Sequence, residues 1–278
     1  MQDVFAHCAE LVRTADRDRF IAALFAPAQL RGALHAVYAF NAEVTRVRDV
    51  AHAALPGEIR LQWWSDVISG ERAGEARANP VAAALLFTME RHQLSSATLI
   101  DLIEAHRFDL YDDPMASVDD LEAYTTRTSS ALFALATQIL ADTDAVTACL
   151  PAGIAYGIAG LLRVFPQHAA RRQLYVPTGL LEHHQVRLHD LFAGRSSPGL
   201  KAALADLRDL ARRQLEAAGT LMASLPPEAV PALLPLALVG RSLDRLNRSD
   251  PFAPTEIPPW RRQWLIWRAA RNPARITR

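Results

Sequence analysis

The spacing of apolar side chains constrains this chain most, because it follows the period of an α-helix along most of its length. Two stretches place apolar or aromatic residues mostly three or four positions apart: Phe20, Leu24, Leu30, Leu34, Val37 and Phe40, and then Leu99, Leu102, Ile103 and Leu110, with His106 in the same stripe. Side chains at these spacings share one face of a helix. No stretch alternates as a strand would, so the pattern predicts an all-α protein.

Proline-containing pairs mark where helices should begin or end. Asn79-Pro80, Ser197-Pro198 and Pro258-Pro259 are such pairs, and Pro151 is a further expected break. Proline ends or starts helices because it lacks a backbone N–H and fixes φ. The breaks predict roughly eight to ten helices. They are short, and no long flexible linker or internal repeat divides the chain, which favours one domain.

Composition excludes several classes of protein. Half of the 278 residues are hydrophobic and the formal net charge is zero, so a sizeable core is expected and nucleic-acid binding is not. Cys8 and Cys149 stand alone, which argues against a zinc site or a disulfide framework. The first twenty residues are too acidic for a secretory signal, and the apolar runs are broken short of a membrane span. We expect a cytoplasmic protein, soluble or peripheral to a membrane.

Two segments carry a family resemblance. They are Leu34–Asp49, LHAVYAFNAEVTRVRD, and Gly157–Pro177, GIAGLLRVFPQHAARRQLYVP. With the opening DRDRFIAALFAPAQLRGAL and the later DLEAYTTRTSSALFALA, they resemble the squalene/phytoene synthase family in the family's own order. The resemblance implies a prenyl synthase-type helical bundle with a central cavity. It predicts a single domain over residues 1–278, with a core from about residue 16 to about residue 271.

Active members of that family join two prenyl diphosphates head to head, using Mg²⁺ held by DxxxD motifs on two facing helices. Carboxylates four residues apart share a helix face and suit this hard cation. After the matching Tyr38-Ala39-Phe40, the first motif here has Thr45 and Asp49 at the aspartate positions. The second motif has Val164 and His168. Three of the four ligands implied by the resemblance are therefore missing, and we predict neither catalytic residues nor a metal.

The altered motifs resemble one branch of the family, the assembly factors of respiratory complex I. That branch implies a non-catalytic role in assembling NADH:quinone oxidoreductase at the inner face of the cytoplasmic membrane. The partners would be complex I subunits or assembly intermediates. Two alternatives stay open: a head-to-head prenyl diphosphate transferase that still uses Mg²⁺, and a module that binds a lipid or isoprenoid without chemistry. Pro166 should also break the helix that presents the second motif.

Several side chains near the motifs are candidates for lining a cavity or binding an anion. The resemblance places Tyr38, Arg163, Arg171, Arg172 and Tyr175 there. Arginine suits phosphate because its planar donors bind two oxygens at once. Ordinary surface arginines are the alternative. His168 lacks partner ligands, so a packing or hydrogen-bonding role is expected.

A literal DxxxD also occurs outside the family motifs, at Asp109 and Asp113. Asp113 precedes Pro114, which favours a helix end. Acidic residues at such a position are usually solvated, so we predict that neither forms a replacement metal site.

The C-terminal segment combines tryptophan with arginine. Trp260, Trp264 and Trp267 fall on one helix face, and Arg268 lies beside them. The simplest interpretation is that the tryptophans cover the bundle's own core. A reversible membrane contact and a docking surface for a protein partner are the alternatives.

Overall fold

The computed structural model describes residues 2–51 and 53–277, and every regular element in these residues is helical, which confirms the all-α prediction. The α-helices are α1 (Gln2–Ala15), α2 (Arg17–Ala23), α3 (Ala28–Thr45), α4 (Val47–Val50), α5 (Ala54–Ile68), α6 (Ala73–Ala78), α7 (Pro80–His92), α8 (Ser96–His106), α9 (Val118–Thr125), α10 (Ala131–Ala141), α11 (Val146–Arg163), α12 (Phe165–Ala170), α13 (Thr178–His183), α14 (Leu188–Phe192), α15 (Pro198–Met222), α16 (Val230–Leu233), α17 (Val239–Arg248) and α18 (Pro259–Arg271). Short 3-10 turns are η1 (Arg107–Leu110), η3 (Pro227–Ala229), η4 (Leu234–Leu238) and η5 (Pro273–Arg275), and η2 (Thr126–Ser130) is a π-helical turn.

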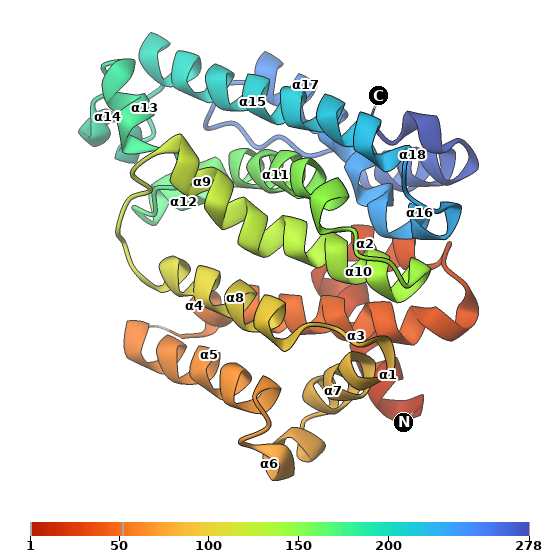
Figure 1. Ribbon diagram of the computed structural model, residues 1–278. Helices are drawn as coiled ribbons and strands as arrows, with labels where there is room; N and C mark the ends of the chain where they lie inside the picture. Colours follow the sequence, from red (N-terminus) through yellow and green to blue (C-terminus); the bar gives the residue numbers. More distant parts are fainter. Residues whose placement is uncertain (1, 52, 278) are drawn as a thin grey trace.

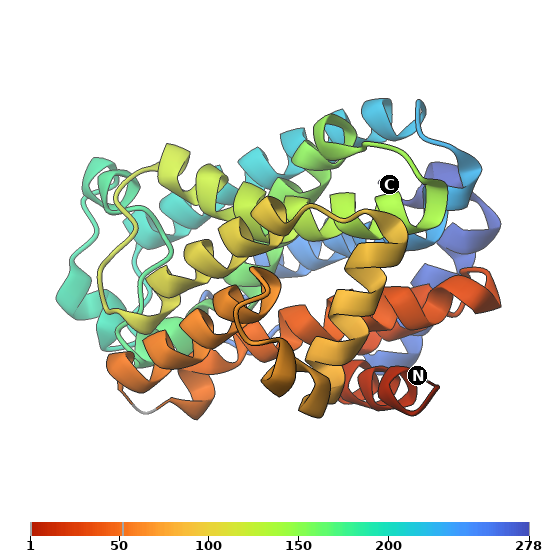
Figure 2. The ribbon, with the colours of Figure 1, turned by 60° about the horizontal axis from the view of Figure 1, so that its bottom comes forward.

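The helices enclose two hydrophobic clusters. One is formed mainly by α1 to α8 and the other mainly by α11 to α18, below and above in Figure 1. Helix α10 contributes to both, because it packs on α3 and on α11. Across the molecule, each of the long helices α3, α10, α11 and α15 therefore packs against the next in that order (Figure 2). This arrangement sets the first motif, at the end of α3, opposite the second, at the end of α11.

Helix starts follow the proline pairs, as predicted. Helices α7, α15 and α18 begin at Pro80, Pro198 and Pro259. The Asn79 side chain accepts hydrogen bonds from two backbone N–H groups of the first turn of α7, which is how an N-cap residue satisfies a helix end. Pro151 was wrongly expected to be a break: it lies inside α11. One lost hydrogen bond does not end a helix that is held by packing along its buried face.

The expected number of helices was too low. The described residues contain eighteen α-helices, because several helices are interrupted without proline or glycine. At Asp16 the chain turns from α1 into α2, and the aspartate side chain caps the second helix. At Arg46 a single residue separates α3 from α4. Such breaks carry no strong residue signal, so only the tertiary fold locates them.

Two glycines let α11 approach the turn η2 closely. A Cβ built on Gly153 would lie 2.1 Å from the backbone of Ser130, and one on Gly157 would lie 2.7 Å from Thr125. Ser130 Oγ donates to the Leu150 carbonyl at 2.7 Å across the same contact. Only glycine fits such an approach, so the contact fixes α11, and with it the second motif, against α9 and η2.

Helix α11 is long and apolar enough to cross a membrane by length and composition, which corrects the expectation that every apolar run falls short. Half of that stretch is buried, however, and the helix packs on α10, α15 and α17. In this structure α11 is a core helix of the bundle.

Candidate functional site

The structure brings the two altered motifs together at the ends of their helices. Helix α3 ends at Thr45, and Asp49 lies on the separate short helix α4. Helix α11 ends before Val164, and His168 lies on α12. The two motifs are joined by an ion pair in which Arg171 donates to Asp49 at 2.7 Å.

Breaks in both motif helices alter how the former ligand positions are presented. Pro166 lies in the first turn of α12, so α11 does stop where the sequence predicts. In the first motif, Arg48 of α4 donates to the Leu110 carbonyl and to Asp112, and these bonds hold α4 against the end of η1. In neither motif do the two former ligand positions share one continuous helix, so the geometry that aligns a DxxxD pair is lost.

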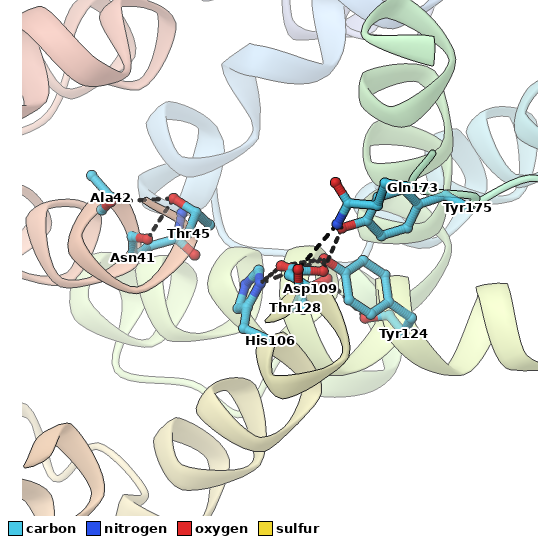
Figure 3. A network of polar contacts seen from close by, with 9 residues as sticks. All are labelled: Asn41, Ala42, Thr45, His106, Asp109, Tyr124, Thr128, Gln173 and Tyr175. Atoms are coloured by element: carbon cyan, nitrogen blue, oxygen red, sulfur yellow. Dashed lines mark hydrogen bonds and ion pairs between the residues drawn. The ribbon is translucent and has the colours of Figure 1, made fainter. Parts of the chain in front are cut away.

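The side chains at these positions do not fit a Mg²⁺ site. Thr45 donates its hydroxyl to the carbonyls of Asn41 at 2.9 Å and Ala42 at 3.3 Å within its own helix (Figure 3). Asp49 is half exposed and already paired with Arg171, and Val164 has no donor atom. Magnesium requires several oxygen ligands in octahedral geometry. Across residues 2–51 and 53–277, no three His, Cys, Asp or Glu side chains gather to hold an ion.

His168 packs instead of ligating. Its ring lies 4.6 Å from the ring of Tyr175. Burial lowers the pKa of His168 to about 4, although Asp109 acts to raise it and Arg171 lowers it further. A neutral imidazole at physiological pH is the consequence. Beside it lies an apolar pocket of about 10 Å³ between Leu162, Phe165 and neighbouring side chains, which is at the lower limit for one water molecule.

The most highly connected polar group near the motifs is Asp109, which lies outside both. Its carboxylate accepts hydrogen bonds from Tyr175 at 2.5 Å and from Tyr124 at 3.0 and 3.2 Å, and it lies 2.7 Å from Nδ1 of His106 (Figure 3). Gln173 donates to the Tyr175 hydroxyl at 2.8 Å and to the Asp109 carbonyl at 3.2 Å. Burial, and then the Asp109 carboxylate, raise the pKa of both tyrosines, so both remain hydrogen-bond donors.

The expectation that Asp109 is solvated was therefore wrong, whereas Asp113 is exposed as predicted. Asp109 can be buried because the two tyrosine hydroxyls and the His106 ring form hydrogen bonds with its carboxylate. A carboxylate whose oxygens are hydrogen-bonded is tolerated inside a protein. A sequence signal for this existed. His106 belongs to the apolar stripe of α8, and Asp109 follows three residues later, on the same helix face.

Tyr38 is not among the residues of this polar network. It is buried on α3, and the guanidinium of Arg19 lies 5.7 Å from its ring and 4.8 Å from the ring of Tyr156 on α11. Arg19 is itself buried and pairs with Asp16 at 2.6 Å. The space between α3 and α11 at this level is therefore occupied by an arginine in contact with aromatic rings.

The three arginines proposed to bind an anion are held by different partners. Arg171 pairs with Asp49, and Arg172 lies over the ring of Phe192 at 5.9 Å. Arg163 ends α11 and is only partly exposed. No contact between described residues draws these three guanidinium groups together, so anion binding at this place stays a prediction.

The tryptophans of α18 do not cover the bundle's core, which corrects the simplest interpretation of that helix. Trp260, Trp264 and Trp267 are 69%, 44% and 47% exposed, whereas Ile266 and Ala269 form the buried side. Helix α18 packs against η4 and α2 through the side that carries Ile266 and Ala269, and Arg262 forms an ion pair with Asp18 of α2 on that same side. The tryptophans are therefore left on the outward side.

Comparison with known proteins assigns the class. A sequence profile described as squalene/phytoene synthase matches residues 12–268, and this chain belongs to that family. The fold agrees: a solved dehydrosqualene synthase superposes with a TM-score of 0.83 at 17% identity, covering 96% of this chain and 95% of that one. The squalene synthase HpnC from Alicyclobacillus acidocaldarius gives a TM-score of 0.71 at 21% identity, over 97% and 94% of the two chains.

Within the family, the chain is similar to assembly factor 6 of NADH dehydrogenase (ubiquinone) complex I. The rat protein is 28% identical over 89% of this chain and 75% of its own length, and the human protein is 28% identical over 88% and 74%. The 15-cis-phytoene synthase of Synechocystis is 23% identical over 78% and 68%. These findings confirm the family and the resemblance to its assembly-factor branch.

Proposed function

We propose that this protein is a non-catalytic member of the squalene/phytoene synthase family that aids assembly of NADH:quinone oxidoreductase at the membrane. The observation that carries the proposal is the donor set of the two motifs. One half-exposed carboxylate, Asp49, remains, and it is neutralised by Arg171. Without a metal cluster the leaving diphosphate of a prenyl transfer has little assistance. The similarity to complex I assembly factors supplies the role.

The proposal places the protein at the cytoplasmic face of the energy-transducing membrane, in contact with complex I subunits or assembly intermediates. It uses no cofactor in this role. A lipid- or isoprenoid-binding module is compatible with the same fold. The apolar pocket beside His168 and Tyr175 has a volume of only about 10 Å³, far below that of pockets that hold small molecules, so the structure does not favour that role.

Deleting the gene in its host tests the proposal directly. We expect loss of NADH-driven respiration and of assembled complex I, with carotenoid and hopanoid contents unchanged. Expression of wild type should restore complex I, and so should Asp49→Ala, because that carboxylate holds no metal in the proposed role. Intact complex I together with a missing isoprenoid would contradict the proposal and favour the prenyl transferase alternative.

A biochemical assay separates the same alternatives. Purified protein incubated with farnesyl or geranylgeranyl diphosphate and Mg²⁺ or Mn²⁺ should form no head-to-head product. Turnover near ordinary enzyme rates, on the order of 1 per second, would contradict the loss of catalysis. If Asp49→Ala also abolished that turnover, the remaining carboxylate would be identified as a working ligand.

A further inference from the structure

The outward face of α18 is built from tryptophan rings with arginines lying on them. The guanidinium of Arg268 lies 4.9 Å from the ring centre of Trp264, and that of Arg271 lies 5.0 Å from the ring centre of Trp267. Trp260, one turn before Trp264, is the most exposed of the three tryptophans. Paired in this way, each ring presents an apolar body beside a positive charge.

A basic groove of about 620 Å³ adjoins this face, between α15, α17 and α18. Its charged lining consists of five arginines and two acids: Arg212, Arg241, Arg261, Arg268, Arg275, Glu216 and Asp244. Only one of these arginines, Arg212, forms an ion pair with a residue that the structure describes; it lies 3.3 Å from Asp209 and from Asp244. The groove therefore carries an excess of positive charge that the described residues do not neutralise.

The tryptophan face and the groove are continuous, because Trp264 and Arg268 belong to both. Arginine binds phosphate through two parallel N–H donors. Tryptophan prefers the boundary between water and hydrocarbon, where its ring is buried and its N–H stays hydrated. An isolated phosphate would use the arginines and leave the outward rings without a role. A phospholipid at a membrane surface uses both.

We propose that the groove between α15, α17 and α18 binds the phosphate head group of an anionic phospholipid, with Trp260, Trp264 and Trp267 entering the membrane interface. Such attachment is reversible and weakens with salt, because exposed charges are screened beyond about 10 Å at 0.1 M ionic strength. Lipid binding at this groove stands whether or not the protein assists complex I, so the two proposals fail separately.

Vesicle sedimentation of the purified full-length protein tests the site. We expect binding to mixed phosphatidylcholine and phosphatidylglycerol vesicles, little binding to phosphatidylcholine alone, and release by salt. Arg241→Gln with Arg268→Gln should weaken partitioning about 30-fold, since each basic residue near an anionic surface contributes about fivefold. The matched control is Arg77→Gln with Arg91→Gln, which removes the same charge from exposed positions on α6 and α7, remote from α18 (Figure 1). It should bind as wild type does.

Tryptophan fluorescence supplies the second readout. Three of the five tryptophans are on α18, so mixed vesicles should shift the emission to the blue, and Trp260→Ser with Trp267→Ser should remove most of the shift. Equal binding to neutral and anionic vesicles, or equal loss in the groove and control variants, overturns the proposal. Polyglutamate that binds the groove while vesicles do not would overturn it in favour of an acidic protein partner. Unchanged thermal unfolding of each variant shows that any loss is not misfolding.

Discussion

Two aspartates near the motif ends, Asp49 and Asp109, have opposite surroundings. Asp49 occupies a former ligand position, its side chain is 54% exposed, and its one ion-pair partner among the described residues is Arg171. Asp109 lies outside both motifs, its side chain is 13% exposed, and it is bound by two tyrosines and a histidine. Burial and the number of partners, and not the place in a motif, therefore decide which carboxylate the fold depends on.

Removing Asp109 should have the largest effect on stability. Asp109→Ala deprives Tyr124, Tyr175 and His106 of their shared acceptor. A buried donor without an acceptor lowers the stability by the free energy of removing that donor from water. We expect the free energy of unfolding in urea to fall by about 3–5 kcal/mol. Tyr175→Phe, which removes a single donor, should cost less. A loss below that of the tyrosine variant would mean that the network does not act as one buried unit.

Acidification should have the next largest effect, through His168, which lies near both aspartates. Its pKa is about 4 in the folded protein against 6.5 as the ordinary value. Below pH 6.5 the unfolded chain takes up a proton that the folded chain refuses until about pH 4. The free energy of unfolding should therefore be full above pH 6.5 and fall as the pH drops through that window, by about 3 kcal/mol from this group.

The same measurement on His168→Gln isolates the contribution of His168. Burial also lowers the pKa of His35 to about 4, and the contribution of His35 to the pH dependence remains in the variant. The variant should lose less stability than wild type between pH 6.5 and pH 4. His183→Gln, at an exposed position, is the control and should follow wild type. Identical curves for wild type and His168→Gln would place His168 in contact with solvent and not in the packed position beside Tyr175.

Removing Asp49 should have the smallest effect. Exposed ion pairs contribute little, so Asp49→Ala should change the free energy of unfolding by about 0.5 kcal/mol. A double-mutant cycle with Arg171→Ala should give a coupling energy of similar size. A coupling several times larger would show that the ion pair holds the two motifs together, and the contrast with Asp109 would then disappear.

Much of this protein follows from local features of its sequence. The period of its apolar residues determines the helical class, and the proline pairs set the starts of α7, α15 and α18, because both act through neighbouring residues. The ordered motifs identify the family. The loss of three carboxylates is also visible in the sequence, because Thr45, Val164 and His168 stand at their positions.

What the sequence did not reveal depends on contacts between distant residues. Tyr175 reaches Asp109 across 66 positions, and Arg171 reaches Asp49 across 122. Arg262 pairs with Asp18 across 244 positions, on the side of α18 that packs against η4 and α2, and the tryptophans are left on the other side. The basic groove joins arginines of α15, α17, α18 and the turn η5. Periodicity states which residues share a helix face, but only packing against the rest of the chain decides whether that face is buried, because burial is a property of the neighbours.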